Sequence, residues 1–259
     1  MITQPIKWHG GKRYLAKWIH SLTPAGYTHR NIVFGGGLGE FWNWPHEGIS
    51  ESVNDTYGEL TNFWHTLQDK QKFADFHRQV DAMPFSQVEW EDSDTTTALG
   101  FFVRFRQSRQ GLGRDYATPT SRTRRGMNEQ VSAWLTAVDG LVDCHQRLRR
   151  VEIRNLHFRE FIRIYDHPKA LFYCDPPYVH STRSTGGGEY GHEMTEADHT
   201  ELLEQLAGLT GRFLLSGYRC AMYDQAAAKH GWARHEKEID NKASSQKSKP
   251  RKMECVWAN

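Results

Sequence analysis

Short apolar runs alternate with helical segments at both ends of the chain, and this alternation limits the possible folds more than any other feature of the sequence. Residues 31–34 (NIVF) and 52–55 (SVND) have the pattern of strands, and apolar residues at helical spacing precede the first (residues 12–22) and follow the second (residues 57–67). Later strand candidates are residues 151–155, 170–174, 212–216 and 254–257. Strands that alternate with helices predict an α/β fold, a doubly wound sheet with helices on both faces.

The middle of the chain breaks this alternation. Between residues 64 and 150 the sequence shows helical periodicity and no convincing strand. One helical face is formed by Val131, Trp134, Leu135 and Val138. We therefore predict that residues 64–150 are a helical insertion, and that residues 1–63 and 151–259 together form one α/β domain.

Composition and residue patterns predict a hydrophobic core, no membrane span, reduced cysteines and no metal site. Hydrophobic residues make up 38% of the 259 residues, which is enough for a core, and no apolar run approaches the roughly 18 residues of a membrane span. Because the amino terminus shows no export signal, the cysteines are expected to be reduced thiols in the cytoplasm. They are scattered along the chain as Cys144, Cys174, Cys220 and Cys255. No histidine pattern predicts a metal site.

The stretch YCDPPY (173–178) follows an apolar run and predicts a buried strand that stops abruptly, because proline cannot continue a strand ladder. Asp175 and the carbonyl group of Pro176 offer two fixed hydrogen-bond acceptors, and Pro177 leads to the flat ring of Tyr178. Two acceptors beside a ring suit the exocyclic amino group of a planar base. The alternative is a strand that ends at prolines beside a surface acid.

A glycine run and an acid follow the first two strand candidates. Gly35, Gly36 and Gly37 either let a ligand approach the backbone closely or form a plain tight turn. The run is neither the spaced GxGxxG of dinucleotide binders nor a P-loop, so we expect no phosphate cradle. Asp55 suits ribose hydroxyl groups, although an aspartate also caps a helix such as the one predicted near Tyr57. Together these features favour a ligand with an adenosine-like part.

Several motifs in order resemble the DNA adenine-N(6) methyltransferases of the Dam type: KWHGGK (7–12), FGGG (34–37), VND followed by ELTNFW, LFYCDPPY, LLSGY (214–218) and ECVWAN (254–259). The resemblance runs nearly from end to end. It implies a Rossmann-like methyltransferase sheet and S-adenosylmethionine as cofactor. It also implies that Trp8 and Lys12 contact the cofactor, that Phe34 and the glycines after it lie beside its methionine part, and that Asp55 holds its ribose.

The sequence departs from this family in two places. Ile32 and Val33 stand where the family usually has Glu-Pro before the glycine loop. His157 and Phe158 lie where the family often has an acid close to the cofactor's adenine. Both changes remove carboxylates near the cofactor, which implies weaker cofactor binding or compensation by other residues. The reaction type is less affected, because DPPY is intact.

The resemblance implies transfer of a methyl group from S-adenosylmethionine to the exocyclic amino nitrogen of adenine in double-stranded DNA. Hydrogen bonds to Asp175 and the Pro176 carbonyl favour a tetrahedral amino nitrogen, whose lone pair is then available. The base must be flipped out of the duplex and stacked, here on Tyr178. The loop at 181–192, which has three consecutive glycines, is expected either as a lid over the flipped base or as a disordered connection.

Positive charge is concentrated inside the insertion, although the net charge of the chain is only +2. Seven arginines and one acid lie between residues 104 and 125. Because a solvated helix face usually balances its charges, we predict contacts with DNA phosphates and guanine edges. The candidates are Arg109, Arg114, Arg122, Arg124 and Arg125. A second basic run, residues 242–252, predicts a loop that either touches the DNA backbone or is only solvated.

Two other functions stay open at this point. One is a DNA-binding protein that kept the fold and lost the cofactor. The other is a protein glutamine methyltransferase, although such enzymes usually carry Asn at the first catalytic position. We expect a cytoplasmic monomer whose partner is double-stranded DNA, with no membrane and no metal. The sequence leaves open the DNA site and whether a cognate restriction endonuclease accompanies the chain.

Overall fold

The computed structural model describes residues 1–179, 193–240 and 251–259. Its main sheet has seven strands in the order β5-β2-β1-β6-β7-β9-β8. Strand β1 pairs in parallel with β2 and β6, β6 pairs in parallel with β7, and β9 runs antiparallel to β7 and β8. The strands are β1 (His29–Ile32), β2 (Ser50–Asn54), β5 (Val151–Arg154), β6 (Ala170–Cys174), β7 (Arg212–Tyr218), β8 (Ala233–Asp240) and β9 (Arg251–Ala258). The mostly parallel sheet confirms the predicted α/β fold.

The chain divides into two compact units. Unit 1 comprises Met1–Ser21, Gly35–Glu47 and Tyr57–Asn155, and unit 2 comprises Leu22–Phe34, Gly48–Thr56 and Leu156–Asn259. All strands of the main sheet except β5 belong to unit 2, together with α8 (Phe158–Tyr165), α9 (Glu196–Ala207) and α10 (Ala221–His230). Unit 1 is mostly helical.

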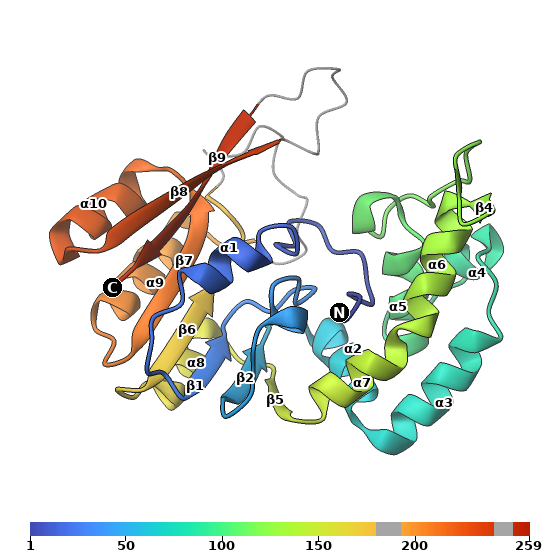
Figure 1. Ribbon diagram of the computed structural model, residues 1–259, viewed down its shortest axis with the longest axis horizontal. Coiled ribbons are helices and arrows are strands. Elements are labelled where there is room, and N and C mark those ends of the chain that lie inside the picture. The colour runs from blue at the N-terminus through green and yellow to red at the C-terminus, as the bar shows by residue number, and fades with distance from the viewer. Residues whose placement is uncertain (180–192, 241–250) are drawn as a thin grey trace. The chain divides into compact units, whose positions relative to one another are not determined.

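Alternate residues of the central strands build the core of unit 2. Phe172 lies opposite Phe213, and Leu215 lies opposite Trp257, with all four side chains fully buried. Helices α8, α9 and α10 contribute side chains to the same apolar cluster, and Figure 1 shows α8 and α9 close to β6 and β7. Helix α9 begins at the predicted capping box, in which Thr195 and Asp198 exchange hydrogen bonds between side chain and backbone.

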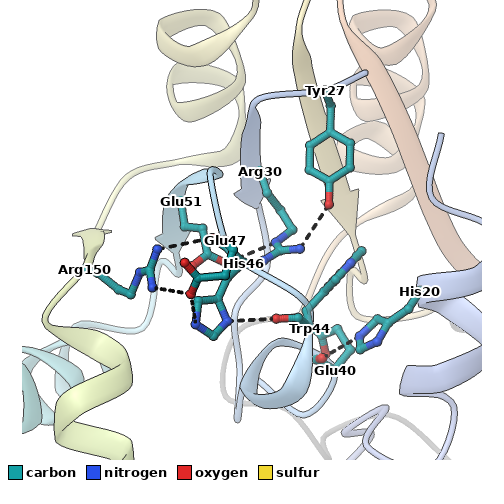
Figure 2. Close-up of polar contacts among 9 residues, drawn as sticks. All are labelled: His20, Tyr27, Arg30, Glu40, Trp44, His46, Glu47, Glu51 and Arg150. Carbon is teal, nitrogen blue, oxygen red and sulfur yellow. Dashed lines mark hydrogen bonds and ion pairs between the residues drawn. The ribbon is translucent and has the colours of Figure 1, made fainter. Parts of the chain in front are cut away.

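A buried ion pair joins the amino-terminal halves of β1 and β2. Arg30 and Glu51 are opposite each other in the parallel register, and their side chains are almost fully buried. The Arg30 Nε donates to Glu51 Oε1 at 3.1 Å, and a terminal nitrogen of Arg30 donates to the Tyr27 hydroxyl at 3.2 Å (Figure 2). Because removing one partner would leave the other charge buried and uncompensated, the pair fixes the register of the two strands that lead to Phe34 and Asp55.

Unit 1 is organised around α2 and an aromatic core. Phe63 of α2 stacks on Phe101 and Phe102 of α5, with ring centroids 5.6 and 6.0 Å apart. The helices of this unit are α1 (Ala16–Ser21), α2 (Gly58–Gln68), α3 (Lys70–Asp81), α4 (Gln87–Glu91), α5 (Ala98–Arg106), α6 (Glu129–Asp139) and α7 (Leu141–Leu148), with 3-10 turns η1 (Phe41–Asn43) and η2 (Arg109–Gly111). Figure 2 also shows His20, which stacks on Trp44 and lies 2.9 Å from the Glu40 carbonyl.

Three sequence expectations need correction. The helical face predicted from Val131, Trp134, Leu135 and Val138 does not pack as one surface, because Trp134 and Val138 are buried whereas Leu135 is 41% exposed. The insertion was expected to lack strands, but it contains a short hairpin of β3 (Thr123–Arg124) and β4 (Met127–Asn128). Strand β8 was not predicted, because it lies at the sheet edge, where charged residues are favoured and an apolar pattern is absent.

Candidate active site

In unit 2, three predicted site residues come directly after parallel neighbouring strands. Phe34 follows β1 closely, Asp55 follows β2, and Asp175 follows β6. The pairing of β1 with β6 extends one step further, since the Val33 backbone amide donates to the Tyr173 carbonyl at 2.9 Å. Carboxyl ends of parallel strands meet at one edge of a sheet, which is where open α/β folds bind ligands. The three side chains therefore belong to the same edge.

The DPPY turn lies at the end of the most buried strand. Every residue of β6 is buried, Asp175 is half-buried, and Pro176 is buried again. Pro177 and Tyr178 are half-buried. Because neither proline has a backbone N–H to continue the ladder, the strand stops here and its last acid is presented at the sheet edge.

Tyr178 is held at both its ring and its hydroxyl group. The hydroxyl donates a short hydrogen bond to the buried carboxylate of Glu254 in β9. The ring meets Tyr218 of β7 edge to face, with centroids 4.7 Å apart and planes at 76°. Burial, and then the negative charges of Glu254 and Asp175, raise the pKa of Tyr178 well above its ordinary value. The phenol therefore stays protonated and donates to Glu254.

Asn54, which the sequence interpretation passed over, connects the strand ends. Its side-chain amide donates to the carbonyl groups of Val33 and Leu156, both at 3.0 Å, and its oxygen accepts from the Leu156 amide at 2.9 Å. The side chain is buried. Asn54 thereby fixes the chain just before Phe34, before Asp55 and before His157.

Aromatic rings flank this edge of unit 2. Phe34 packs on Phe158 with centroids 5.8 Å apart, and the ring of the exposed His157 lies 4.3 Å from that of Phe158. His157 is also the residue before α8, and its Nδ1 accepts from the Arg159 amide at 3.4 Å. His157 and Phe158 therefore give this strand end an aromatic character, with the exposed ring of His157 packed on the buried ring of Phe158.

Asp55 does not serve as the helix cap that its sequence position also suggested. Helix α2 begins at Gly58, its N-cap residue is Tyr57, and the cap has no side-chain hydrogen bond. Asp55 is half-buried after β2. Ribose binding by Asp55 stays a prediction.

In unit 1 the glycine loop packs tightly against Trp8. A Cβ atom on Gly36 would lie 2.7 Å from Trp8 Nε1, and one on Gly37 would lie 2.5 Å from Trp8 Cβ. Gly36 and the buried Leu38 have positive φ angles of 48° and 54°. A leucine in this region is a strained backbone outlier. The glycines are therefore required by the close approach of this loop to Trp8 as well as by its turn.

Trp8 and Lys12 are both anchored within unit 1. The Trp8 ring lies 5.2 Å from Phe105 and 6.4 Å from Phe101. Lys12 is buried, and its Nζ donates to the Gly10 carbonyl at 3.0 Å. The KWHGGK motif therefore forms a compact turn against the aromatic core of the unit.

The arginine-rich segment separates into packed and exposed side chains. Arg104 lies 4.4 Å over the Trp90 ring and donates to two backbone carbonyls, and Arg106 donates to the Ala133 carbonyl at 2.5 Å. Burial lowers the pKa of Arg106 to about 10. The five arginines selected from the sequence are all exposed: Arg109, Arg114, Arg122, Arg124 and Arg125.

Two of these exposed arginines, Arg124 and Arg125, belong to the β3–β4 hairpin, and Arg122 directly precedes it. Its two central turn residues, Arg125 and Gly126, have φ angles of 59° and 76°, as in the tight turns that favour hairpins. Arg125 also donates to the Thr136 hydroxyl at 2.7 Å, which ties the turn to α6. Arg122 lies beside the hairpin, 4.0 Å from Glu129. The hairpin therefore presents Arg122 and Arg124 outward.

Other expectations concern residues outside the described part of the chain. The predicted lid at 181–192 and most of the basic run at 242–252 lie there. Lys252 of that run is described, and its ammonium group lies 4.7 Å over the Tyr218 ring. Among residues 1–179, 193–240 and 251–259, no helix has the length and apolar character needed to cross a membrane.

Residues 117–243 match the family model described as D12 class N6 adenine-specific DNA methyltransferase. The matched range includes the hairpin, β5, the DPPY turn and β7. No curated protein matches the chain.

Proposed function

Since the chain belongs to the D12 class N6 adenine-specific DNA methyltransferase family, we propose that it methylates the exocyclic amino nitrogen of a flipped adenine at a specific site in double-stranded DNA. The family depends on S-adenosylmethionine, which is therefore the expected cofactor. The single observation that carries the proposal is the DPPY turn, in which a half-buried Asp175 ends the central strand β6 and the ring of Tyr178 is held three residues later.

The residues of unit 2 suit this cofactor chemically. Asp55 would offer two carboxylate oxygens to ribose hydroxyl groups, and the rings of Phe34 and His157, which pack on the buried Phe158, would offer flat surfaces to an adenine. When bound, the cofactor supplies a methyl group on a positively charged sulfur. In this proposal, aromatic contacts would compensate for the carboxylate that the motif resemblance leads one to expect near the adenine.

Asp175 would act on the amino group of the target base. The adenine lone pair is delocalised into the ring, so the amino group is a poor nucleophile. Acceptors at the Asp175 carboxylate and the Pro176 carbonyl hold its two N–H bonds and favour a tetrahedral nitrogen with a localised lone pair. Because both acceptors are fixed by the end of β6, the site needs little reorganisation during reaction.

Tyr178 would receive the flipped base. Its hydroxyl group donates to Glu254 and its ring meets Tyr218, so the ring that would stack on the adenine is held in place. Flipping a base out of the duplex costs a few kcal/mol, and stacking on an aromatic ring recovers part of that cost. Pro177 links this ring rigidly to the acceptors before it.

Trp8, Lys12 and the glycines belong to unit 1, where they would shape the loop that follows Phe34 and Gly35. Trp8 packs directly on Gly36 and Gly37, so the conformation of the loop that continues from Phe34 and Gly35 depends on that ring. Lys12 holds the KWHGGK turn through its bond to Gly10. Their role in cofactor contact rests on the motif resemblance, and their observed contacts support a role in shaping the loop.

The helical segment would recognise DNA. The five exposed arginines favour contacts with phosphates and base edges, and Arg122 and Arg124 project from the hairpin. We propose residues 64–150 as the target-recognition insertion, with residues 1–63 and 151–259 as the catalytic domain. The enzyme would act as a monomer in the cytoplasm, where its DNA substrate is present.

Transfer of labelled methyl from S-adenosylmethionine to unmethylated duplex DNA, followed by sequencing of methylated adenines, tests this function. Asp175→Ala should lower the transfer rate by a factor on the order of 100 or more, because fixed polar groups at reacting atoms contribute that much. Its DNA affinity should stay within about twofold, since Arg122 and Arg124 are unchanged.

Asp139→Ala, which changes an exposed acid at the end of α6, is the matched control and should retain activity. Full activity of Asp175→Ala would contradict the proposed mechanism. DNA binding without any methyl transfer or cofactor binding by the unchanged protein would instead favour a binding protein that lost its cofactor.

A further inference from the structure

The carboxylate of Glu254 is buried next to the predicted base-stacking ring. Its side chain accepts the hydrogen bond of the Tyr178 hydroxyl, and the residue is 1% exposed. A buried carboxylate is costly unless hydrogen bonds satisfy it. In β9, Glu254 stands directly before the apolar run CVWA. Neither strand propensity nor core packing therefore explains an acid at this position.

The sheet register explains how Glu254 reaches the DPPY turn. Glu254 lies opposite Tyr218 in the antiparallel pairing of β9 with β7. Opposite residues place their side chains on the same face of a sheet. Tyr178 contacts both members of this pair, Tyr218 through its ring and Glu254 through its hydroxyl group. Two strands thus hold one ring from two directions.

We propose that Glu254 is a positioning residue for Tyr178, and that it sets the orientation in which the flipped adenine stacks. This inference rests on the proposed function, because it assigns Tyr178 to the target base. A carboxylate that accepts from the phenol restricts the position of the phenol oxygen. Because that oxygen lies on the axis about which the ring turns, the contact with Tyr218 restricts the ring plane as well. Together the two contacts hold the ring relative to Asp175, which precedes it by three residues. Glu254 itself touches neither base nor cofactor in this arrangement.

Lys252 extends the same support. Its ammonium group lies over the Tyr218 ring, on the strand that carries Glu254. A cation over an aromatic face favours one ring orientation. Tyr218, held by this contact, presents a fixed ring to Tyr178.

Kinetics of three variants test the proposal. Glu254→Ala and Tyr178→Phe each remove one side of the hydrogen bond and should each lower kcat for methyl transfer about tenfold, the effect expected of one charge-assisted hydrogen bond. The double variant should be no slower than either single variant, since both remove the same interaction. Glu254→Gln keeps an acceptor and should recover most of kcat. KM for S-adenosylmethionine should stay unchanged throughout.

A crosslinking measurement reports the stacking geometry directly. DNA that carries 5-iodouracil in place of the target adenine should crosslink to Tyr178 under ultraviolet light. The yield should fall about fivefold or more in Glu254→Ala, while DNA affinity stays within about twofold. Glu238→Ala, at an exposed glutamate of the neighbouring strand β8, is the matched control and should crosslink like the unchanged protein.

The outcomes separate the two proposals. If the unchanged protein neither methylates DNA nor crosslinks through Tyr178, the proposed function fails. If it does both, and Glu254→Ala, Glu254→Gln and Tyr178→Phe behave like it, the positioning role of Glu254 is overturned alone. Additive losses in the double variant would also overturn it, because they would show that the two side chains act independently.

Discussion

At the scale of single residues, burial decides which charged side chains are available to ligands. Arg104 and Arg106 belong to the same arginine-rich segment as Arg122 and Arg124, but they bind backbone carbonyls and an indole ring inside unit 1. Charge counting along the sequence treats them all alike. The structure shows that part of the positive charge stabilises the unit instead.

Burial of Lys7 should make the stability of the protein depend on pH. Burial, and next the charge of Arg106, lower the pKa of Lys7 to about 8 from the ordinary 10.5, although its Nζ donates to Ser108 and Gln130. Between these two pH values the unfolded chain binds a proton that the folded chain lacks. The free energy of unfolding should therefore rise as pH increases from 8 to 10.5, by up to about 3 kcal/mol.

Urea unfolding of Lys7→Met measures this contribution. The free energy of unfolding of Lys7→Met should lack the rise between pH 8 and 10.5. Over this range the unchanged protein should therefore become more stable relative to the variant. Lys70→Met, at an exposed lysine that begins α3 in the same unit, controls for the loss of a charge. A pH-independent difference between Lys7→Met and the unchanged protein would show that Lys7 is not the group responsible.

Residues that act through a local motif were predictable, whereas those that act across the fold were not. The strand, the two prolines and Tyr178 lie within nine residues of sequence, so the chemistry of DPPY was visible there. Glu254 is 76 residues from Tyr178, and only the β7–β9 register brings them together. An acid inside an apolar strand was the available signal for it.

At the scale of elements, the positions of the strand ends matter more for the candidate site than the lengths of the strands. The sequence predicted β6 with its observed bounds, and β1, β2, β5, β7 and β9 to within a few residues, because apolar residues mark them. The β3–β4 hairpin was not predicted, because each strand has only two residues and its turn uses Arg-Gly rather than the usual Asn-Gly. Edge strand β8 was not predicted either, because its many charged residues give no apolar strand pattern.

Asn54 provides a prediction at this scale, because it joins the end of β1 to the segment after β5. Asn54→Ala would leave the Val33 carbonyl and the Leu156 amide and carbonyl without this partner. We expect a loss of about 3 kcal/mol in the free energy of unfolding. The dissociation constant for S-adenosylmethionine should rise about tenfold, because Phe34 and His157 follow the loosened strand ends.

Calorimetric titration with S-adenosylmethionine checks the second effect. Asn62→Ala is the matched control, since Asn62 is exposed on α2 and makes one 3.3 Å bond to the Thr96 carbonyl. An unchanged cofactor affinity in a folded Asn54→Ala protein would separate these strand ends from the cofactor site.

At the scale of the whole molecule, a small net charge hides an uneven distribution. The chain has a formal net charge of +2, so its overall field adds little to the attraction of DNA. We therefore expect the exposed arginines of the 104–125 segment to supply a large part of the electrostatic contribution to DNA affinity. The salt dependence of DNA binding should then respond to the replacement of a few named side chains.

The slope of log affinity against log salt tests this localisation. Each phosphate contact adds about 0.9 to the slope, so replacing Arg122 and Arg124 together by Gln should reduce its magnitude by about 2. Arg149→Gln, at an exposed arginine of the same unit outside the segment, should leave the slope unchanged. Arg104→Gln should lower the free energy of unfolding without changing the slope, because that side chain is held over Trp90. Equal slopes for the double variant and Arg149→Gln would remove the hairpin arginines from the DNA interface.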